Sequence, residues 1–72
     1  MSRIAVLTQM ATDLLRQSPL PALRCLMVTE TDREVIISGR VWSYYQKQIA
    51  QETVRPSLGE RRLSNQVTVE LD

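Results

Sequence analysis

The sequence predicts a small α+β domain in the order α-β-β-α-β, with two helices packed on one face of a three-stranded mixed sheet. Three observations predict it. Apolar residues recur at helical spacing in two segments, three short stretches have the composition or alternation of strands, and prolines and glycines separate these segments. Because an amphipathic helix and a small sheet must each cover an apolar face, we expect two layers around one core.

The first helix is predicted over about residues 3–17. Apolar side chains recur there at three- and four-residue steps, which places them on one face of a helix. Those residues are Ile4, Leu7, Met10, Ala11, Leu14 and Leu15. The stretch "SPLP" at 18–21 ends the helix, since proline lacks an N–H and pushes the preceding residue out of helical space.

Two strands are predicted next, as an antiparallel hairpin. The first is "LRCLMVT" at 23–29 and the second is "VIIS" at 35–38, with polar residues between them. Gly39 follows the second strand, where the chain is expected to leave the sheet. Glycine suits a position with a positive φ or a close approach of backbone, so we interpret Gly39 as structural.

A second helix is predicted from about Tyr44 to Val54. Ser43 and Gln46 have the spacing of a capping box, in which a serine caps the helix and a glutamine lies three residues later. Pro56 and Gly59 are expected to end the helix, with Gly59 as the turn into the next strand.

The last segment, "LSNQVTVELD" at 63–72, alternates as a half-buried strand does. Leu63, Val67, Val69 and Leu71 share its apolar face. Asn65 falls on the same face and interrupts the pattern, so it marks either a bulge or the true start of the strand.

Composition limits the function classes. The 72 residues predict one domain over 1–72, with net charge +1, no histidine and a single cysteine. The charge gives no general reason to bind nucleic acid, and an RNA-binding KH-like module would need a Gly-x-x-Gly clamp, whereas the two glycines lie at 39 and 59. Without histidine, or a second cysteine for a metal site, we expect no catalysis, no metal and no cofactor.

No stretch approaches the ~20 apolar residues of a transmembrane helix, and the N-terminal apolar run is too short for a signal peptide. We therefore expect a cytoplasmic protein from the sequence as written. An envelope location is expected instead if the chain is a fragment of a longer exported protein.

Residues 23–69 resemble a BON domain. The matching features are "LRCLMV", "VIISGRVWS", Ala50, Gly59, Leu63, Asn65 and "VTV", preceded by a helix as in that family. Arg33 stands where the family usually has glycine in the hairpin turn, and Glu60 where it usually has an apolar residue. The resemblance implies a small bacterial module that binds phospholipid or associates with membranes.

The candidate binding residues centre on the aromatic side chains. Trp42, Tyr44 and Tyr45 lie within four positions, and we expect Tyr45 to fill the core while Trp42 and Tyr44 are exposed. Aromatic rings beside basic residues suit a membrane interface or a protein interface. The basic residues of the predicted surface are Arg40 and Lys47 beside the rings, and Arg55, Arg61 and Arg62 around the end of the second helix.

Two functions follow as hypotheses. The first is a non-enzymatic module that associates peripherally with anionic phospholipid through the residues just named. The second is a protein-interaction or homo-oligomerisation module that uses the sheet face without helices, where Met27 and Ile36 are the candidate contacts.

Overall fold

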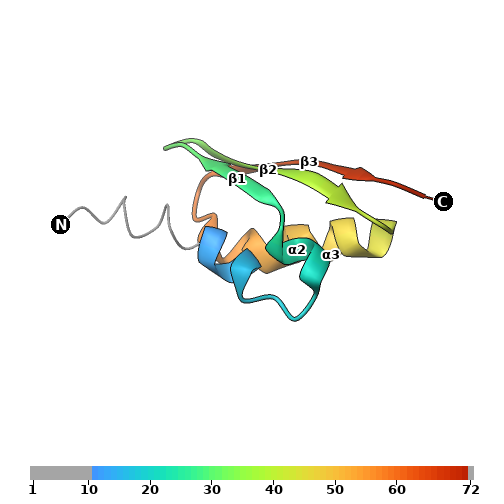
Figure 1. Ribbon diagram of the computed structural model, residues 1–72. Helices are drawn as coiled ribbons and strands as arrows, with labels where there is room; N and C mark the ends of the chain where they lie inside the picture. The colour runs from blue at the N-terminus through green and yellow to red at the C-terminus, as the bar shows by residue number, and fades with distance from the viewer. Residues whose placement is uncertain (1–10, 72) are drawn as a thin grey trace.

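The computed structural model describes residues 11–71 and shows an α+β fold of two layers (Figure 1). The sheet forms one layer, and all the helices lie on one of its faces. Residues 11–16 are helical, and the elements that follow are α2 (Pro21–Arg24), β1 (Met27–Glu30), β2 (Glu34–Val41), α3 (Tyr44–Val54), the 3-10 turn η1 (Arg55–Ser57) and β3 (Arg62–Val69). The predicted fold class is confirmed; the part of the first predicted helix over 3–10 lies outside the described residues.

The sheet has the order β1-β2-β3, so β2 is central. β1 pairs with β2 antiparallel, with Val28 opposite Ile37. β3 pairs with β2 in parallel, with Asn65 opposite Ile37. The sheet is therefore mixed, as predicted, and α3 makes the connection between the two parallel strands.

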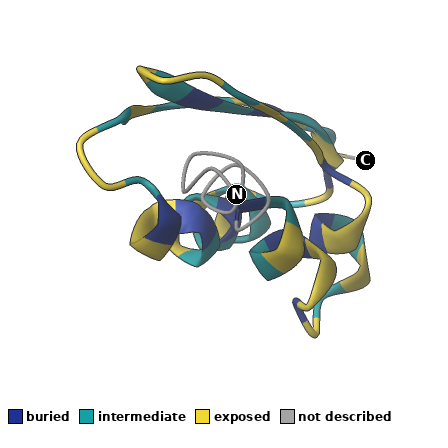
Figure 2. Cartoon of the chain, turned by 90° about the vertical axis from the view of Figure 1, so that its left-hand side faces the viewer, coloured by how far each residue is buried: buried dark blue, intermediate teal, exposed yellow. Residues whose placement is uncertain are grey.

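The core lies between the sheet and the helices (Figure 2). Alternate residues of β2 point into it, and α3 contributes two small side chains. Its buried apolar members are Ala11, Leu15, Leu23, Leu26, Val35, Ile37, Val41, Ala50, Val54 and Val67. No phenylalanine occurs in the chain, so aliphatic side chains fill this space.

The predicted start of the first strand, at Leu23, is wrong. Leu23 lies in α2, and the strand starts only at Met27. Pro21 occupies the first turn of α2, where its missing N–H costs nothing. Leu23 and Leu26 are both buried, and a spacing of three residues puts two side chains on one side of a helical turn but on opposite faces of a strand. Cys25, between them, is exposed.

Gly39 lies inside β2 and not at the exit of the strand, which continues to Val41. Both reasons considered for glycine apply. Its φ is +126°, and a Cβ at this position would lie 2.9 Å from Cδ2 of Leu26. Gly59 has φ +60° in the turn that precedes β3, as expected. Because glycine has no Cβ, β2 can lie close to the buried side chain of Leu26 at this position.

The predicted bounds of α3 are confirmed. Oγ of Ser43 accepts the N–H of Gln46 at 3.1 Å, as a cap does. Oε1 of Gln46 accepts the N–H of Trp42 at 2.7 Å, one residue before the cap. The two bonds tie the start of the helix to the end of β2. Among residues 11–71, no helix is long and apolar enough to cross a membrane.

Asn65 causes no bulge, since the register of β3 with β2 is unbroken from Arg62 to Val69. Its side chain points to α3, where Nδ2 donates to the carbonyl of Lys47 at 3.1 Å. Its Oδ1 accepts the N–H of Val67 at 3.2 Å. An amide thus replaces an aliphatic side chain on the inner face because it links β3 to the helix backbone.

Candidate functional site

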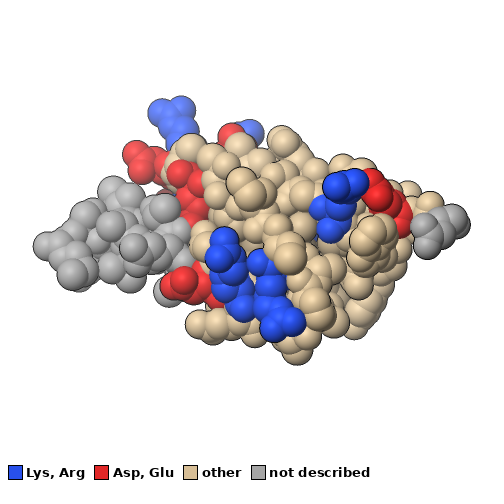
Figure 3. All heavy atoms as spheres, in the orientation of Figure 1, with Lys and Arg blue, Asp and Glu red and all other residues tan. Residues whose placement is uncertain are grey.

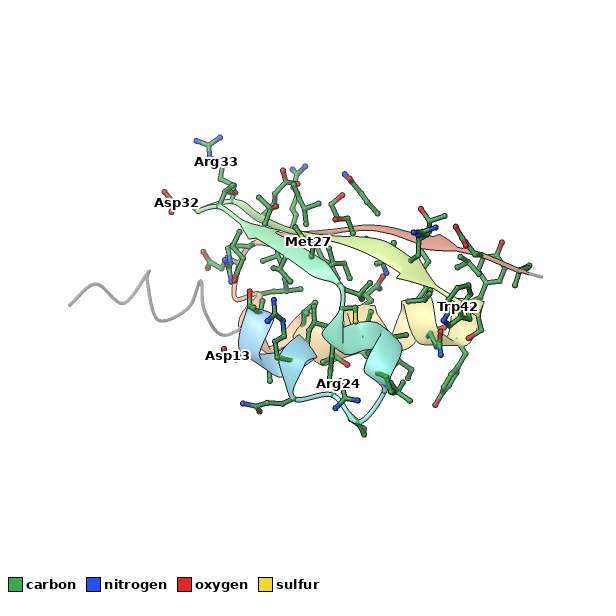
Figure 4. All side chains as sticks on the ribbon, in the orientation of Figure 1. Asp13, Arg24, Met27, Asp32, Arg33 and Trp42 are labelled. Atoms are coloured by element: carbon green, nitrogen blue, oxygen red, sulfur yellow. The ribbon has the colours of Figure 1, made fainter. Side chains whose placement is uncertain are left out.

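Large apolar side chains are exposed at one end of the molecule. Trp42 is 61% exposed, Tyr44 is 69% and Tyr45 is 70%, and all three stand where β2 gives way to α3 (Figure 4 labels Trp42). Leu71 is 67% exposed. It directly follows Glu70, whose N–H donates to the carbonyl of Val41 at 2.9 Å. We call Trp42, Tyr44, Tyr45 and Leu71 the aromatic end.

Two predictions about these residues are wrong. Tyr45 was expected in the core, but it lies nine positions before buried Val54, and nine steps of about 100° put the two on opposite sides of a helix. Leu71 was assigned to the inner face of β3, but the strand ends at Val69. Both side chains instead add to the exposed apolar surface.

The charge at the aromatic end is nearly balanced. Nη1 of Arg40 lies 3.1 Å from Oε1 of Glu70, and the two side chains are 70% and 42% exposed. Such an exposed pair contributes about 0–1 kcal/mol to stability and is easily rearranged. Lys47 is half-buried on α3. Arg40 is therefore the main cation that the aromatic end offers to a partner.

The second predicted basic group does not join the first. Arg55 follows α3 at its C-terminal end and pairs with Glu52 at 2.9 Å. Arg62 begins β3, at the end of the sheet opposite to Val69, and lines a shallow depression with Arg33 and Glu34. Figure 3 likewise shows basic side chains in separate groups on the face it displays. The predicted surface therefore divides into two distant parts.

Arg61 is not available to a membrane, contrary to its place in the predicted surface. Its side chain is 12% exposed, and its Nη1 lies 2.9 Å from Oε1 of Glu30, which is only 2% exposed. Nη2 donates to the carbonyl of Ser57 at 2.6 Å, and Nε donates to the carbonyl of Leu58 at 3.2 Å. Nη1 also approaches the carbonyl of Thr31 at 3.4 Å. This guanidinium therefore joins the end of β1 to the turn that precedes β3.

Glu30 is the most unusual titratable group of the described chain. Burial raises its pKa above the ordinary value of 4.5, and the hydrogen bond and charge of Arg61 oppose that rise. Its second oxygen, Oε2, is buried without a hydrogen-bond partner among residues 11–71. The carboxylate is thus held by one strong contact only.

A pH dependence follows from this shift. Because the pKa of Glu30 is higher in the folded state than in the unfolded state, the folded state binds more protons, and its stability falls as pH rises from 4.5 through the raised pKa. We expect the free energy of unfolding of the wild type, relative to Glu30→Gln, to decrease over that interval. Urea unfolding of both proteins at a series of pH values measures the difference, and an increase with pH would contradict the shift.

The face of the sheet without helices is mostly polar. Met27 and Ile36, the two predicted contacts, do lie on it, since the alternate residues Val35 and Ile37 point into the core. Met27 is 67% exposed, whereas Ile36 is half-buried. The uncharged polar side chains on the same face are Thr29, Ser38, Ser64, Gln66 and Thr68, and the charged ones include Glu34, Arg40 and Arg62. This open face therefore offers one exposed apolar side chain in polar surroundings.

Sequence reasoning missed the contacts made across the fold. Glu30 and Arg61 are 31 positions apart, and nothing in the sequence pairs them. The inward turn of Asn65 was visible only as a polar residue at an apolar position of the alternation. Within residues 11–71, no group of three or more His, Cys, Asp and Glu side chains could hold a metal ion.

The chain was also compared with known proteins. No protein-family model matches it, and a search of curated proteins finds no match. The resemblance to BON domains therefore stays a prediction based on the residues quoted for it.

Proposed function

We propose that this chain is a non-enzymatic binding module that associates peripherally with anionic phospholipid membranes through its aromatic end. The observation that supports this proposal most is the exposure of all three aromatic rings, each above 60%, at one end of the fold. A chain with so few large side chains would gain stability by burying them. Their exposure together favours a partner at this end.

The chemistry of these side chains favours the membrane surface. Tryptophan and tyrosine place an apolar ring in the acyl region and a polar group among the headgroups. Arg40 lies beside them and can leave Glu70 to meet a lipid phosphate, because their ion pair is exposed. The resemblance to BON domains points to the same function.

Trp42 gives a direct test because it is the only tryptophan of the chain. With anionic vesicles at low salt, we expect co-flotation and a blue shift of tryptophan emission; neutral vesicles, or physiological salt, should weaken both. Trp42→Ala should reduce the partition coefficient about tenfold, as the loss of one buried ring predicts. Met27→Ala is the matched control, since Met27 is equally exposed but lies on the open face.

Arg40→Glu separates charge from apolar burial. It should weaken binding to anionic vesicles and leave the weak binding to neutral vesicles unchanged. Arg33→Glu is the matched control, since it makes the same charge change in the hairpin turn, at the opposite end of the molecule (Figure 4). Failure to float with anionic vesicles at either salt, or equal losses for Trp42→Ala and Met27→Ala, would reject the aromatic end as a membrane site.

The open face supports a second candidate function, binding of another protein. Met27 is exposed there, and the register places Ile36 opposite Thr29, diagonal to Met27. If vesicles fail to bind the chain, this face becomes the leading site. Met27→Glu or Ile36→Lys should then abolish an interaction that Trp42→Ala leaves intact.

A further inference from the structure

β3 leaves a long edge of the sheet unpaired among the described residues. It spans eight residues, against four for β1 at the other edge. The N–H of Arg62 donates to the carbonyl of Arg33, just before β2, and the N–H of Glu70 donates to the carbonyl of Val41 in β2, at 2.9 Å in both cases. Since backbone direction alternates along a strand, the N–H and C=O groups of the odd-numbered residues of β3 face the free edge.

The sequence of β3 is complementary to itself when two copies run antiparallel. With Gln66 opposite Gln66 of a second copy, Arg62 lies opposite Glu70, the residue directly after β3, and Ser64 lies opposite Thr68. On the inner face, Leu63 lies opposite Val69. This register also makes odd-numbered residues face one another as hydrogen-bonded pairs, which the edge geometry requires.

The charges continue this complementarity across the sheet. Arg40 is bonded to Glu70 on the open face, and Glu34 is opposite Arg62 in the register of β2 with β3. In the paired arrangement, four side chains of alternating charge therefore lie in a row across each end of the junction. Arg40 and Glu70 belong to one copy, and Arg62 and Glu34 belong to the other. Moving the centre to Asn65 would instead put Arg62 opposite Thr68 and Glu70 opposite the turn before β3, so the pairing of Arg62 with Glu70 favours the register centred on Gln66.

We propose that two copies of this chain pair through β3 in that register, which forms a continuous six-stranded sheet with two-fold symmetry. Asn65 and Val67 of the two copies then face each other, and the N–H of Val67 passes from Oδ1 of its own Asn65 to the partner's backbone carbonyl. This pairing uses the strand edge. It uses none of the four side chains of the aromatic end, and Arg40 is the one residue that the junction and the proposed membrane site share.

Cysteine cross-linking tests the register. In a Cys25→Ser background, Gln66→Cys places two thiols across a non-hydrogen-bonded pair, where Cα atoms lie about 4.5 Å apart and a disulfide can form. Ser64→Cys and Thr68→Cys are the matched controls. Each lies about 13 Å along the strand from its own counterpart and should not cross-link alone, whereas a mixture of the two variants should.

Sedimentation velocity at increasing concentration tests the association itself. We expect a dimer for the wild type, and monomer for Arg62→Glu, which sets two acidic side chains against each other at both ends of the junction. Adding Glu70→Arg to that variant should restore part of the association, because opposite charges face each other again across the junction, while like charges now stand beside Arg40 and Glu34 within each copy. A wild type that stays monomeric up to millimolar concentration, or cross-linking at 64 or 68 alone as strong as at 66, would overturn the proposal. Vesicle binding by a monomer would leave the membrane function standing.

Discussion

Replacing Arg61 with methionine is expected to lower the free energy of unfolding by about 3–5 kcal/mol, the range found when one partner of a buried ion pair is removed. Glu30, whose side chain is 2% exposed, would lose the charge that holds its Oε1. The carbonyls of Ser57 and Leu58 would lose their side-chain donor as well. Proton uptake by Glu30 limits the loss, since its pKa is already raised by burial.

Urea unfolding measures this loss as a lower urea concentration at the midpoint, with a similar dependence of the free energy of unfolding on urea concentration. Arg55→Met is the matched control: its pair with Glu52 is exposed on both sides, so a change of at most about 1 kcal/mol is expected. The double variant Arg61→Met with Glu30→Leu should recover much of the stability, because no buried charge remains. Equal effects of Arg61→Met and Arg55→Met would show that water screens both pairs alike.

Replacing Gly39 with alanine is expected to cost about 2–4 kcal/mol, which combines backbone strain and overpacking. An L-residue rarely adopts its φ of +126°, and the new Cβ would lie 2.9 Å from Cδ2 of Leu26. Thermal or urea unfolding measures the loss.

Gly59→Ala separates the two causes. Gly59 has φ +60° and no atom within 4 Å of the Cβ position, so only strain of about 1–2 kcal/mol is expected. In a Leu26→Ala background, the cost of Gly39→Ala should fall towards that of Gly59→Ala, because the side chain it meets has been shortened. An unchanged cost would mean that backbone strain alone accounts for the destabilisation by Gly39→Ala.

The elements with a clear period were predictable, and those without one were not. α3 has a cap, an apolar stripe and a proline after it, so its bounds agree with prediction. α2 has four residues, too few for a helical period, and only Pro21 marks its start. The apolar composition around it favoured a strand for the same residues.

The candidate site was predictable where it is local in sequence. Trp42, Tyr44 and Tyr45 lie within four positions at the start of one helix, so their closeness in space follows from the sequence. Arg61 and Arg62 also adjoin in sequence, yet the first has a largely buried side chain and the second is exposed. That separation depends on Glu30, which only the completed sheet brings within reach.

Asn65 has a consequence for the exchange of amide hydrogens with solvent. At a free strand edge, the backbone amides of Leu63, Asn65, Val67 and Val69 would all exchange quickly, but Oδ1 of Asn65 already accepts the N–H of Val67. In a single chain, deuterium should therefore enter the Val67 amide more slowly than the other three amides of the edge. Slow exchange at all four would instead indicate a paired edge, so the side chain of Asn65 lets deuterium uptake distinguish the single chain from the dimer.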